Sequence, residues 1–329
     1  AADVAVSAED SSTITATAGA AAVAAAFGAV GVSVSVSVAI ARNSIANDVD
    51  AHLDFADVAV TDIPAYDPTY TDAGVETNRP AQAPAAGTIS VSASENATIG
   101  AISAAAAVAI SGGAVGVSVA GGGAVATNVI TGGTRAYALD STLKAGGDIA
   151  FNATNNSAIA ANIVALAAGV SIGGVAVGAS LGFGVALNAI GYDLGGTRMP
   201  VEVSAYLQGS DVDTYGKLAA AAKSEQSISA NVAAASVAIA AGMYSFSAAG
   251  AAAVTLNRVG VDAHAFIDGG IVKAGDIAIA ALDTSSINAF VGAAAVAVAV
   301  GFGGGSSAVA LGVAYAENVI SNDIEAYAQ

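Results

Sequence analysis

The chain contains two histidines, His52 and His264, and imidazole is the side chain whose ordinary pKa best suits general acid–base catalysis at neutral pH. Three tyrosines, Tyr137, Tyr206 and Tyr327, share their setting, because each of the five residues follows an alanine at a matching point of a repeated sequence. A position that accepts either ring indicates a column of stacked rings and not a catalytic base. We therefore predict that His52, Tyr137, Tyr206, His264 and Tyr327 form a structural ladder.

Acidic residues outnumber basic ones by 26 to 9, and some lie close enough together to offer oxygen ligands to calcium. The candidates are Asp48 with Asp50, Asp211 with Asp213, and Asp268 before two glycines. Neither an EF-hand loop nor the glycine-rich nonapeptide repeat of calcium-binding β-rolls is present. We expect no cofactor and no metal site, and incidental calcium at a loop is the alternative.

The sequence contains neither the glycine-rich motif of a phosphate-binding loop nor the His-Glu-x-x-His motif of a zinc-binding helix. Carboxylates on a β-helix could still act on sugars, and the best local collection of polar side chains is a segment with four prolines near residues 63–86. Tyr66, Tyr70 and Arg79 in this segment are candidates for a ligand loop, although the composition equally fits a loop without a ligand. We predict that the chain is not an enzyme.

The elements that carry these residues repeat along the chain. Starting points at Asp3, Thr88, Asp148, Lys217 and Asp276 are each followed eleven residues later by an isoleucine and 25 residues later by a glycine. The glycines, which we expect at corners of the chain, are Gly28, Gly113, Gly173, Gly242 and Gly301. An asparagine column follows, and we expect its amides to form a hydrogen-bonded ladder at a second corner: Asn43, Asn128, Asn188, Asn257 and Asn318.

These registers define five repeats of about 60 residues, which we place at 3–87, 88–147, 148–216, 217–275 and 276–329. The first and third repeats are longer than the others, and their extra residues lie near 63–86 and 189–200. Insertions that leave the rest of a repeat unchanged belong in surface loops.

Each repeat alternates in hydrophobicity with a period of two residues, which favours β-strands over helices. In the first repeat, the valines from Val30 to Val38 alternate with Gly31, serines and Ala39. We predict two long strands of 12–14 residues and two short strands per repeat. Neither face of the long strands is charged, whereas an independent sandwich needs a charged outer face.

The predicted fold is therefore all-β, a broad β-solenoid of five coils and one continuous domain, with tandem small β-sandwich repeats as the alternative. The smooth Gly/Ala/Ser faces should meet either the opposite wall of the coil or a neighbouring protomer. Long unpaired strand edges at both ends of the stack would favour pairing with further coils, either in a longer chain or in another copy.

Composition limits the partners. A formal net charge of −17 with scattered basic residues offers no surface for nucleic acid, and anionic lipid would repel it. Uncharged runs, such as the one between Asp10 and Arg42, are long enough to span a bilayer, so a membrane-embedded repeat protein is an alternative. Alternating Ser and Gly and an aromatic content of 5% favour a protein without membrane insertion.

The segments Lys144–Ala145–Gly146–Gly147–Asp148–Ile149 and Lys273–Ala274–Gly275–Asp276–Ile277 resemble the turn of filamentous-haemagglutinin-type repeats. The longer Ala/Val/Gly blocks resemble the β-strand repeats of giant bacterial surface proteins, including leukotoxin-like filamentous adhesins. The corresponding junctions at residues 86–89 and 216–218 lack the aspartate.

This resemblance implies secretion to the bacterial surface and a shaft that serves attachment, cohesion or matrix. The expected partners are the chain itself and cell-surface glycans or other matrix. Self-association would use strand edges and small-residue faces. A carbohydrate-binding or carbohydrate-active β-helix is the alternative from another class.

Overall fold

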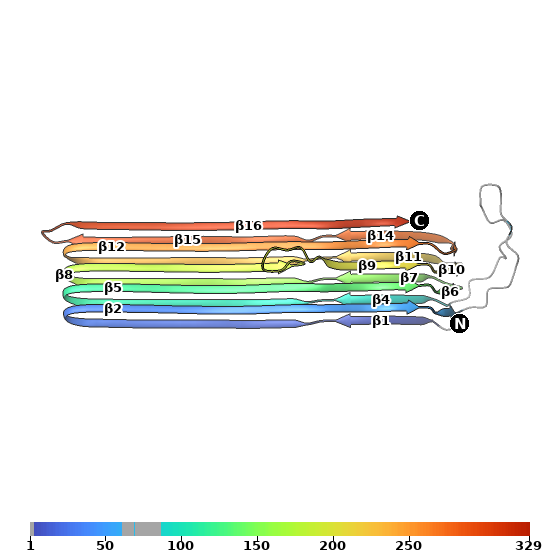
Figure 1. Cartoon of the computed structure of the whole chain (residues 1–329), viewed down its shortest axis with the longest axis horizontal. Coiled ribbons are helices and arrows are strands. Elements are labelled where there is room, and N and C mark those ends of the chain that lie inside the picture. Colours follow the sequence, from blue (N-terminus) through green and yellow to red (C-terminus); the bar gives the residue numbers. More distant parts are fainter. Residues whose placement is uncertain (1–2, 61–68, 70–86) are drawn as a thin grey trace.

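The structure is a computed structural model that describes residues 3–60, 69 and 87–329. Within this part of the chain every regular element is a β-strand, and the strands lie side by side in long parallel rows (Figure 1). The all-β prediction is confirmed. The arrangement is solenoid-like, because the chain returns repeatedly to add one strand to each of three sheets.

The three sheets are parallel, and each takes its strands from successive repeats. The first sheet contains β1 (Val4–Asp10), β4 (Ile89–Glu95), β7 (Ile149–Asn155), β11 (Lys217–Ser224) and β14 (Asp276–Asp283). The second contains β3 (Asp57–Ala59), β6 (Thr142–Ala145), β10 (Asp211–Thr214) and β13 (Val272–Lys273). The third contains β2 (Thr13–Asp54), β5 (Thr98–Leu139), β8 (Ala158–Ile190) with β9 (Val201–Gln208), β12 (Ser227–Asp268), and β15 (Ser286–Gly301) with β16 (Ser306–Ala328).

Equivalent residues of successive repeats are paired neighbours in these sheets. Ile14 pairs with Ile99, which pairs with Ile159, and the same register continues to Ile228 and Ile287. Paired residues of neighbouring parallel strands lie about 4.8 Å apart, whereas separate sandwiches would hold equivalent residues much farther apart. The repeats are therefore stacked, and the tandem-sandwich alternative is wrong.

The long strands differ from the prediction in length. β2, β5 and β12 each extend over 42 residues and include the glycine corner, where the chain reverses between a first leg and a second leg. The second leg continues straight through the asparagine, so the expected second corner does not exist there. The asparagines can remain in a strand because their side chains satisfy one another, and no turn is needed to accommodate them.

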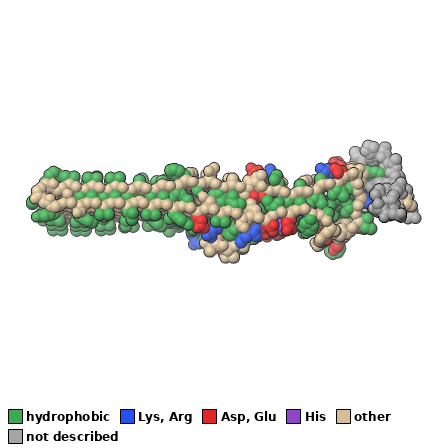
Figure 2. All heavy atoms as spheres, turned by 90° about the horizontal axis from the view of Figure 1, so that it is seen from above, with side chains coloured by type: hydrophobic (Ala, Val, Ile, Leu, Met, Phe, Trp, Pro, Cys, Tyr) green, Lys and Arg blue, Asp and Glu red, His purple; other side chains and the backbone are tan. Residues whose placement is uncertain are grey.

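The half of the molecule next to the glycine corner is a thin, two-layered slab, which we call the blade (residues 13–43 and their equivalents; Figure 2). Its interior is lined by small side chains of both legs, including Ala39, Ala101, Ala165 and Ala253. The first leg of each repeat covers the second leg of the repeat before it, as the hydrogen bond from Ser103 Oγ to the Ala39 carbonyl shows at 3.0 Å. The smooth faces thus meet the opposite wall of the same molecule.

The other half is thicker and holds the main hydrophobic core, and we call it the prism. Its three walls are the first sheet, the second sheet and the ends of the second legs, and they enclose side chains such as Ile89, Leu143, Phe151 and Val261. Larger side chains are needed here because three separated walls leave more space than two appressed ones.

The extra residues of two repeats lie outside the strands. Residues 191–200 leave the sheet after β8, form a bridge between Tyr192 and Arg198, and return as β9. The two additional residues of the fifth repeat lie at its glycine corner, because Gly301 still pairs with Gly242 while Ser306 pairs with Ser245. The segment 63–86 lies outside the described residues, apart from Thr69.

Candidate functional site

The asparagine column forms a continuous ladder inside the molecule, at the junction between blade and prism. Each amide donates from Nδ2 to Oδ1 of the next asparagine, from Asn43 through Asn128, Asn188 and Asn257 to Asn318, at 2.7–2.8 Å. Asn128, Asn188 and Asn257 are buried. A buried amide without a partner costs about 1–3 kcal/mol, so the ladder favours this register over any shifted one.

The ring column is also a ladder, but one of its members differs from the prediction. His52, Tyr137, Tyr206, Phe266 and Tyr327 stack with ring centroids 4.7–5.1 Å apart and planes within 9° of parallel. Offset stacking of this kind adds about 0.5–1.5 kcal/mol per pair beyond the area buried.

His264 is not in this ladder. It pairs with Ser204 on one side and with Glu325 on the other, two residues away from the ring column. The prediction counted from the alanine before His264, but the alanine in register with Ala205 is Ala265. Counting nine residues from Asn257 reaches Phe266, as it reaches His52 from Asn43. A shift of two residues keeps the side chain on the same face, so alternation alone could not detect it.

The corner glycines stack directly on one another, which explains why no larger residue occupies their column. A Cβ added to Gly113, Gly173 or Gly242 would collide with the carbonyl oxygen of the glycine in the preceding repeat. Gly28 has no such neighbour, and the nearest atom to its added Cβ would be 3.8 Å away. The glycines therefore permit close stacking of successive repeats at the corner.

Charged side chains gather over the prism, whereas the visible face of the blade shows none (Figure 2). Arg135 donates to Glu202 at 2.9 Å and to Asp50 at 3.1 Å, and these hydrogen bonds raise the pKa of its guanidinium further above the usual value. Arg258 likewise pairs with Glu317 of the following repeat at 3.2 Å. Such half-exposed pairs stabilise the stack by about 1 kcal/mol or less each.

Glu95 is the one strongly perturbed carboxylate among the described residues, and the sequence did not single it out. It is 1% exposed, and its Oε2 accepts hydrogen bonds from Asn155 at 2.7 Å and Thr134 at 3.1 Å. Burial raises its pKa to about 7, because the interior disfavours the charged carboxylate. The carboxylate of Glu95 is enclosed by side chains of its own and neighbouring repeats.

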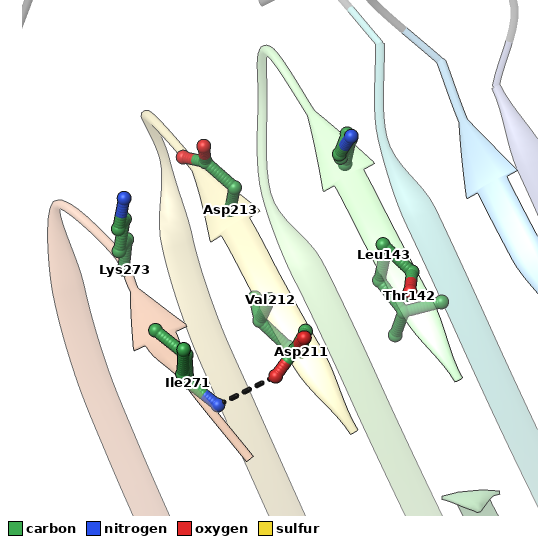
Figure 3. Close-up of a pocket in the computed structure, with 8 residues that line it drawn as sticks. Thr142, Leu143, Asp211, Val212, Asp213, Ile271 and Lys273 are labelled. Atoms are coloured by element: carbon green, nitrogen blue, oxygen red, sulfur yellow. Dashed lines mark hydrogen bonds between the residues drawn. The ribbon is translucent and has the colours of Figure 1, made fainter. Parts of the chain in front are cut away.

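A shallow depression of about 250 Å³ lies on the outside of the second sheet (Figure 3). Asp213 lies between Lys144 and Lys273 on neighbouring strands, and Asp211 accepts a hydrogen bond from the backbone of Ile271 at 2.7 Å. The basic neighbours oppose the binding of a cation at Asp213. Within the described residues, no group of three or more His, Asp or Glu side chains is arranged to hold a metal.

The candidate ligand loop with Tyr66, Tyr70 and Arg79 lies outside the described residues. Its binding of a glycan stays a prediction of the sequence.

The outward sides of the blade are the largest feature that the sequence did not indicate. Large apolar side chains there face away from the interior, with Val30, Leu181 and Leu311 about two-thirds exposed at 65, 66 and 65%. The sequence showed that one face of each long strand is apolar. It did not show that this face would point outward, because apolar residues normally point inward. The small residues take the interior instead, since only they fit between two closely packed sheets.

No family model, no curated protein and no solved structure matches the chain. The described residues contain no helix long and apolar enough to cross a membrane.

Proposed function

We propose that this chain is part of the shaft of an extracellular bacterial filament or adhesin, built as a β-solenoid with about 60 residues per coil. Its role is mechanical and not catalytic: it serves attachment, cohesion or matrix by extending a stack of coils. The placement outside the cell is supported by the resemblance of the turns at 144–149 and 273–277 to those of filamentous-haemagglutinin-type repeats.

Open strand edges support growth of the stack. Within the described residues, the first repeat supplies the terminal strand of each sheet at one end. At the other end the fifth repeat supplies it in the first and third sheets, and the fourth repeat supplies it in the second sheet through β13. Unpaired backbone amides and carbonyls along such strands readily accept a further strand. The edge of the third sheet is the longest, because β2 alone contains 42 residues.

The observation that carries the proposal is the exposure of the inner, small-residue side of β16. In earlier repeats this side is covered by the first leg of the next repeat, and residues such as Ala120, Ala186 and Ala253 are buried. The equivalent side of β16, which includes Ala310, Gly312 and Ala314, is exposed. A further coil, from the same chain or from another copy, would cover this surface as each repeat covers its predecessor.

The small-residue faces therefore have a narrower role in self-association than the sequence suggested. Those on the second legs of the first four repeats are occupied within the molecule, whereas the face on β16 is exposed. At the other end of the stack, the small residues Ala16, Ala18 and Ala20 of the first leg are half-buried. The proposed partner is another coil of the same kind. Cell-surface glycans are a second proposed partner, supported only by the polar and aromatic composition of residues 63–86.

The proposal is tested by placing a charge on the open face. Ala314→Lys adds a long cationic side chain where a further coil would pack, and Ala314 is exposed, so the fold itself is little affected. Wild-type protein should form elongated assemblies that grow with concentration, while Ala314→Lys should not. Sedimentation velocity and negative-stain electron microscopy would measure both.

Met199→Lys is the matched control, because Met199 is 51% exposed on the 191–200 excursion of the third repeat and is not part of the open small-residue face of β16. It should assemble like the wild type. Wild-type protein that remains monomeric at every concentration, or Ala314→Lys protein that assembles equally well, would contradict the proposal.

A further inference from the structure

The outward side of the second legs forms a corrugated apolar surface on the blade. We call it the ridged face and define it by the outward side chains of residues 30–40, 115–125, 175–185, 244–254 and 307–315. No Asp, Glu, Lys or Arg lies within these ranges. The surface is therefore suited to an apolar partner.

Two rows across the ridged face alternate between large and small residues from strand to strand. One row runs Val36, Gly121, Leu181, Gly250 and Leu311, and the next runs Val38, Gly123, Phe183, Ala252 and Val313. In these two rows β2, β8 and β16 thus form ridges, while β5 and β12 form furrows. Nearer the glycine corner β12 instead carries the large side chains of Tyr244 and Phe246. The furrow over β12, walled by the ridges of β8 and β16, has a volume of about 400 Å³.

The spacing of these ridges matches the spacing of the furrows. Neighbouring strands lie about 4.8 Å apart, so ridges recur every 9.6 Å or so, with a furrow midway between them. A second copy can face the first across a two-fold axis that runs parallel to the strands and lies above the gap between β8 and β12. Rotation about this axis leaves each row at the same position along the strand direction. The β8 ridge of each copy then enters the β12 furrow of the other, and each β16 ridge enters a β5 furrow.

We propose that the ridged face pairs with the ridged face of a second copy of this chain in this two-fold arrangement. Two blades would then laminate side by side. This interaction surface is separate from the strand edges, so the inference does not depend on the growth of a filament.

The size of the face is sufficient for a specific contact. Ten residues at about 3.3 Å each and four overlapping strands at about 4.8 Å give about 600 Å² per copy, at the lower end of specific interfaces. Both surfaces are uncharged, so pairing buries apolar area without leaving a charge unpaired. Interdigitated ridges also give the close packing that distinguishes a specific interface from random contact.

A lipid bilayer is the competing occupant, and the structure favours the second copy. The edges of β2 and β16 present unpaired backbone groups, which are costly to bury in hydrocarbon. Fluid lipid chains also gain no shape complementarity from furrows at a fixed spacing, whereas an identical ridged surface fits into them.

The test fills a furrow while making the face more apolar. Gly121→Val places in the β5 furrow the side chain that β2 carries as Val36, and the nearest atom to the added Cβ is 3.8 Å away, so the variant should fold. The parent protein carries Ala314→Lys to block edge growth. It should form a dimer in sedimentation velocity, and Gly121→Val should raise its dissociation constant about tenfold or more, because the partner ridge no longer fits.

Gly100→Val is the matched control. It adds the same side chain on the opposite outward side of the blade, where the nearest atom to an added Cβ is 3.9 Å away, and it should leave the dissociation constant unchanged. A parent protein that stays monomeric, or a Gly121→Val variant that dimerises as tightly as the parent, would overturn the proposal. Binding of the parent to phosphatidylcholine vesicles that increases with Gly121→Val would assign the face to lipid and would also overturn it.

Cross-linking tests the register, and the absence of native cysteine makes it simple. Leu181→Cys protein is mixed with Gly250→Cys protein, each with its own affinity tag, and the mixture is mildly oxidised. The two-fold arrangement places position 181 of one copy over position 250 of the other, so disulfides should join the two variants in preference to like pairs. Equal yields of like and unlike pairs would contradict this register.

Discussion

Asn188 accepts a hydrogen bond from Asn128 and donates one to Asn257, and both neighbours present the same groups to it. When identical asparagines stack in register, each is a suitable partner for the next, because each side-chain amide offers one donor to the following repeat and one acceptor to the preceding repeat. The same logic applies to rings, and it explains why histidine, tyrosine and phenylalanine can share a column.

Glu95 shows what happens when the stacked partners differ. Its column contains Asp10, Asn155, Ser224 and Asp283, so a carboxylate has neighbours that are neutral on one side and acidic on the other. Asn155 and Thr134 donate to one of its oxygens, but burial dominates and raises the pKa to about 7 from the ordinary value of 4.5.

This pKa predicts a pH dependence of stability. Because the folded-state pKa is the higher one, the folded protein holds the proton more tightly, so the stabilisation is complete below about pH 4.5 and is lost as the pH rises through about 7. The shift corresponds to about 3 kcal/mol. Glu95→Gln should remove this dependence and unfold at higher denaturant concentration than the wild type at pH 8.5 or so.

Glu225→Gln is the control, because Glu225 is exposed and forms only a surface pair with Lys223 at 3.4 Å. Its pH profile of stability, measured by urea unfolding, should follow that of the wild type. A Glu95→Gln variant that keeps the wild-type slope between pH 5 and 8 would show that Glu95 is not the responsible group.

From the sequence, a residue could be assigned to its column only where it lies at a constant distance from an unambiguous reference residue in each repeat. The asparagine column was found by its spacing from the isoleucine and glycine registers. The ring column was misread at His264, because an alanine recurs at every second position and cannot fix the register. Glu95 was missed, since nothing in the sequence says which polar residue of a turn points inward.

The corner between the two legs of each long strand depends on close contact between glycines of successive repeats. Gly173→Ala should destabilise the protein by about 1–3 kcal/mol, because the added methyl group meets the carbonyl oxygen of Gly113, which is part of the backbone and has no room to move. Gly100→Ala, with its nearest atom 3.9 Å away, should change the free energy of unfolding little or raise it slightly. Chemical denaturation would measure both, and equal effects of the two substitutions would contradict the stacked corner.

At the level of elements, the alternation of residues predicted the strands and their two faces, but it did not predict the residue at which each strand ends. The first and second legs were expected to be similar in length, yet β2 continues past Asn43 to Asp54. Asparagine often marks a turn, and the sequence alone could not show that a stack of five removes the need for one. The direction of the faces was also open, because it depends on the distance between two sheets.

The whole molecule joins two designs in one stack. The prism has a conventional core of large apolar residues, whereas the blade places its small residues inside and its large ones outside. The sequence registers predicted the repeats, and the uncharged faces of the long strands favoured stacked coils over tandem sandwiches. They could not predict an apolar outer surface, which isolated proteins usually avoid and which suggests that the blade works beside another apolar surface.

The proposed filament requires coils to stack along its axis with their strands perpendicular to it. X-ray fibre diffraction from aligned assemblies of the chain tests this most directly. The account predicts a strong meridional reflection at about 4.8 Å, the spacing between neighbouring strands. A reflection at this spacing on the equator, or assemblies with no such meridional reflection, would contradict it.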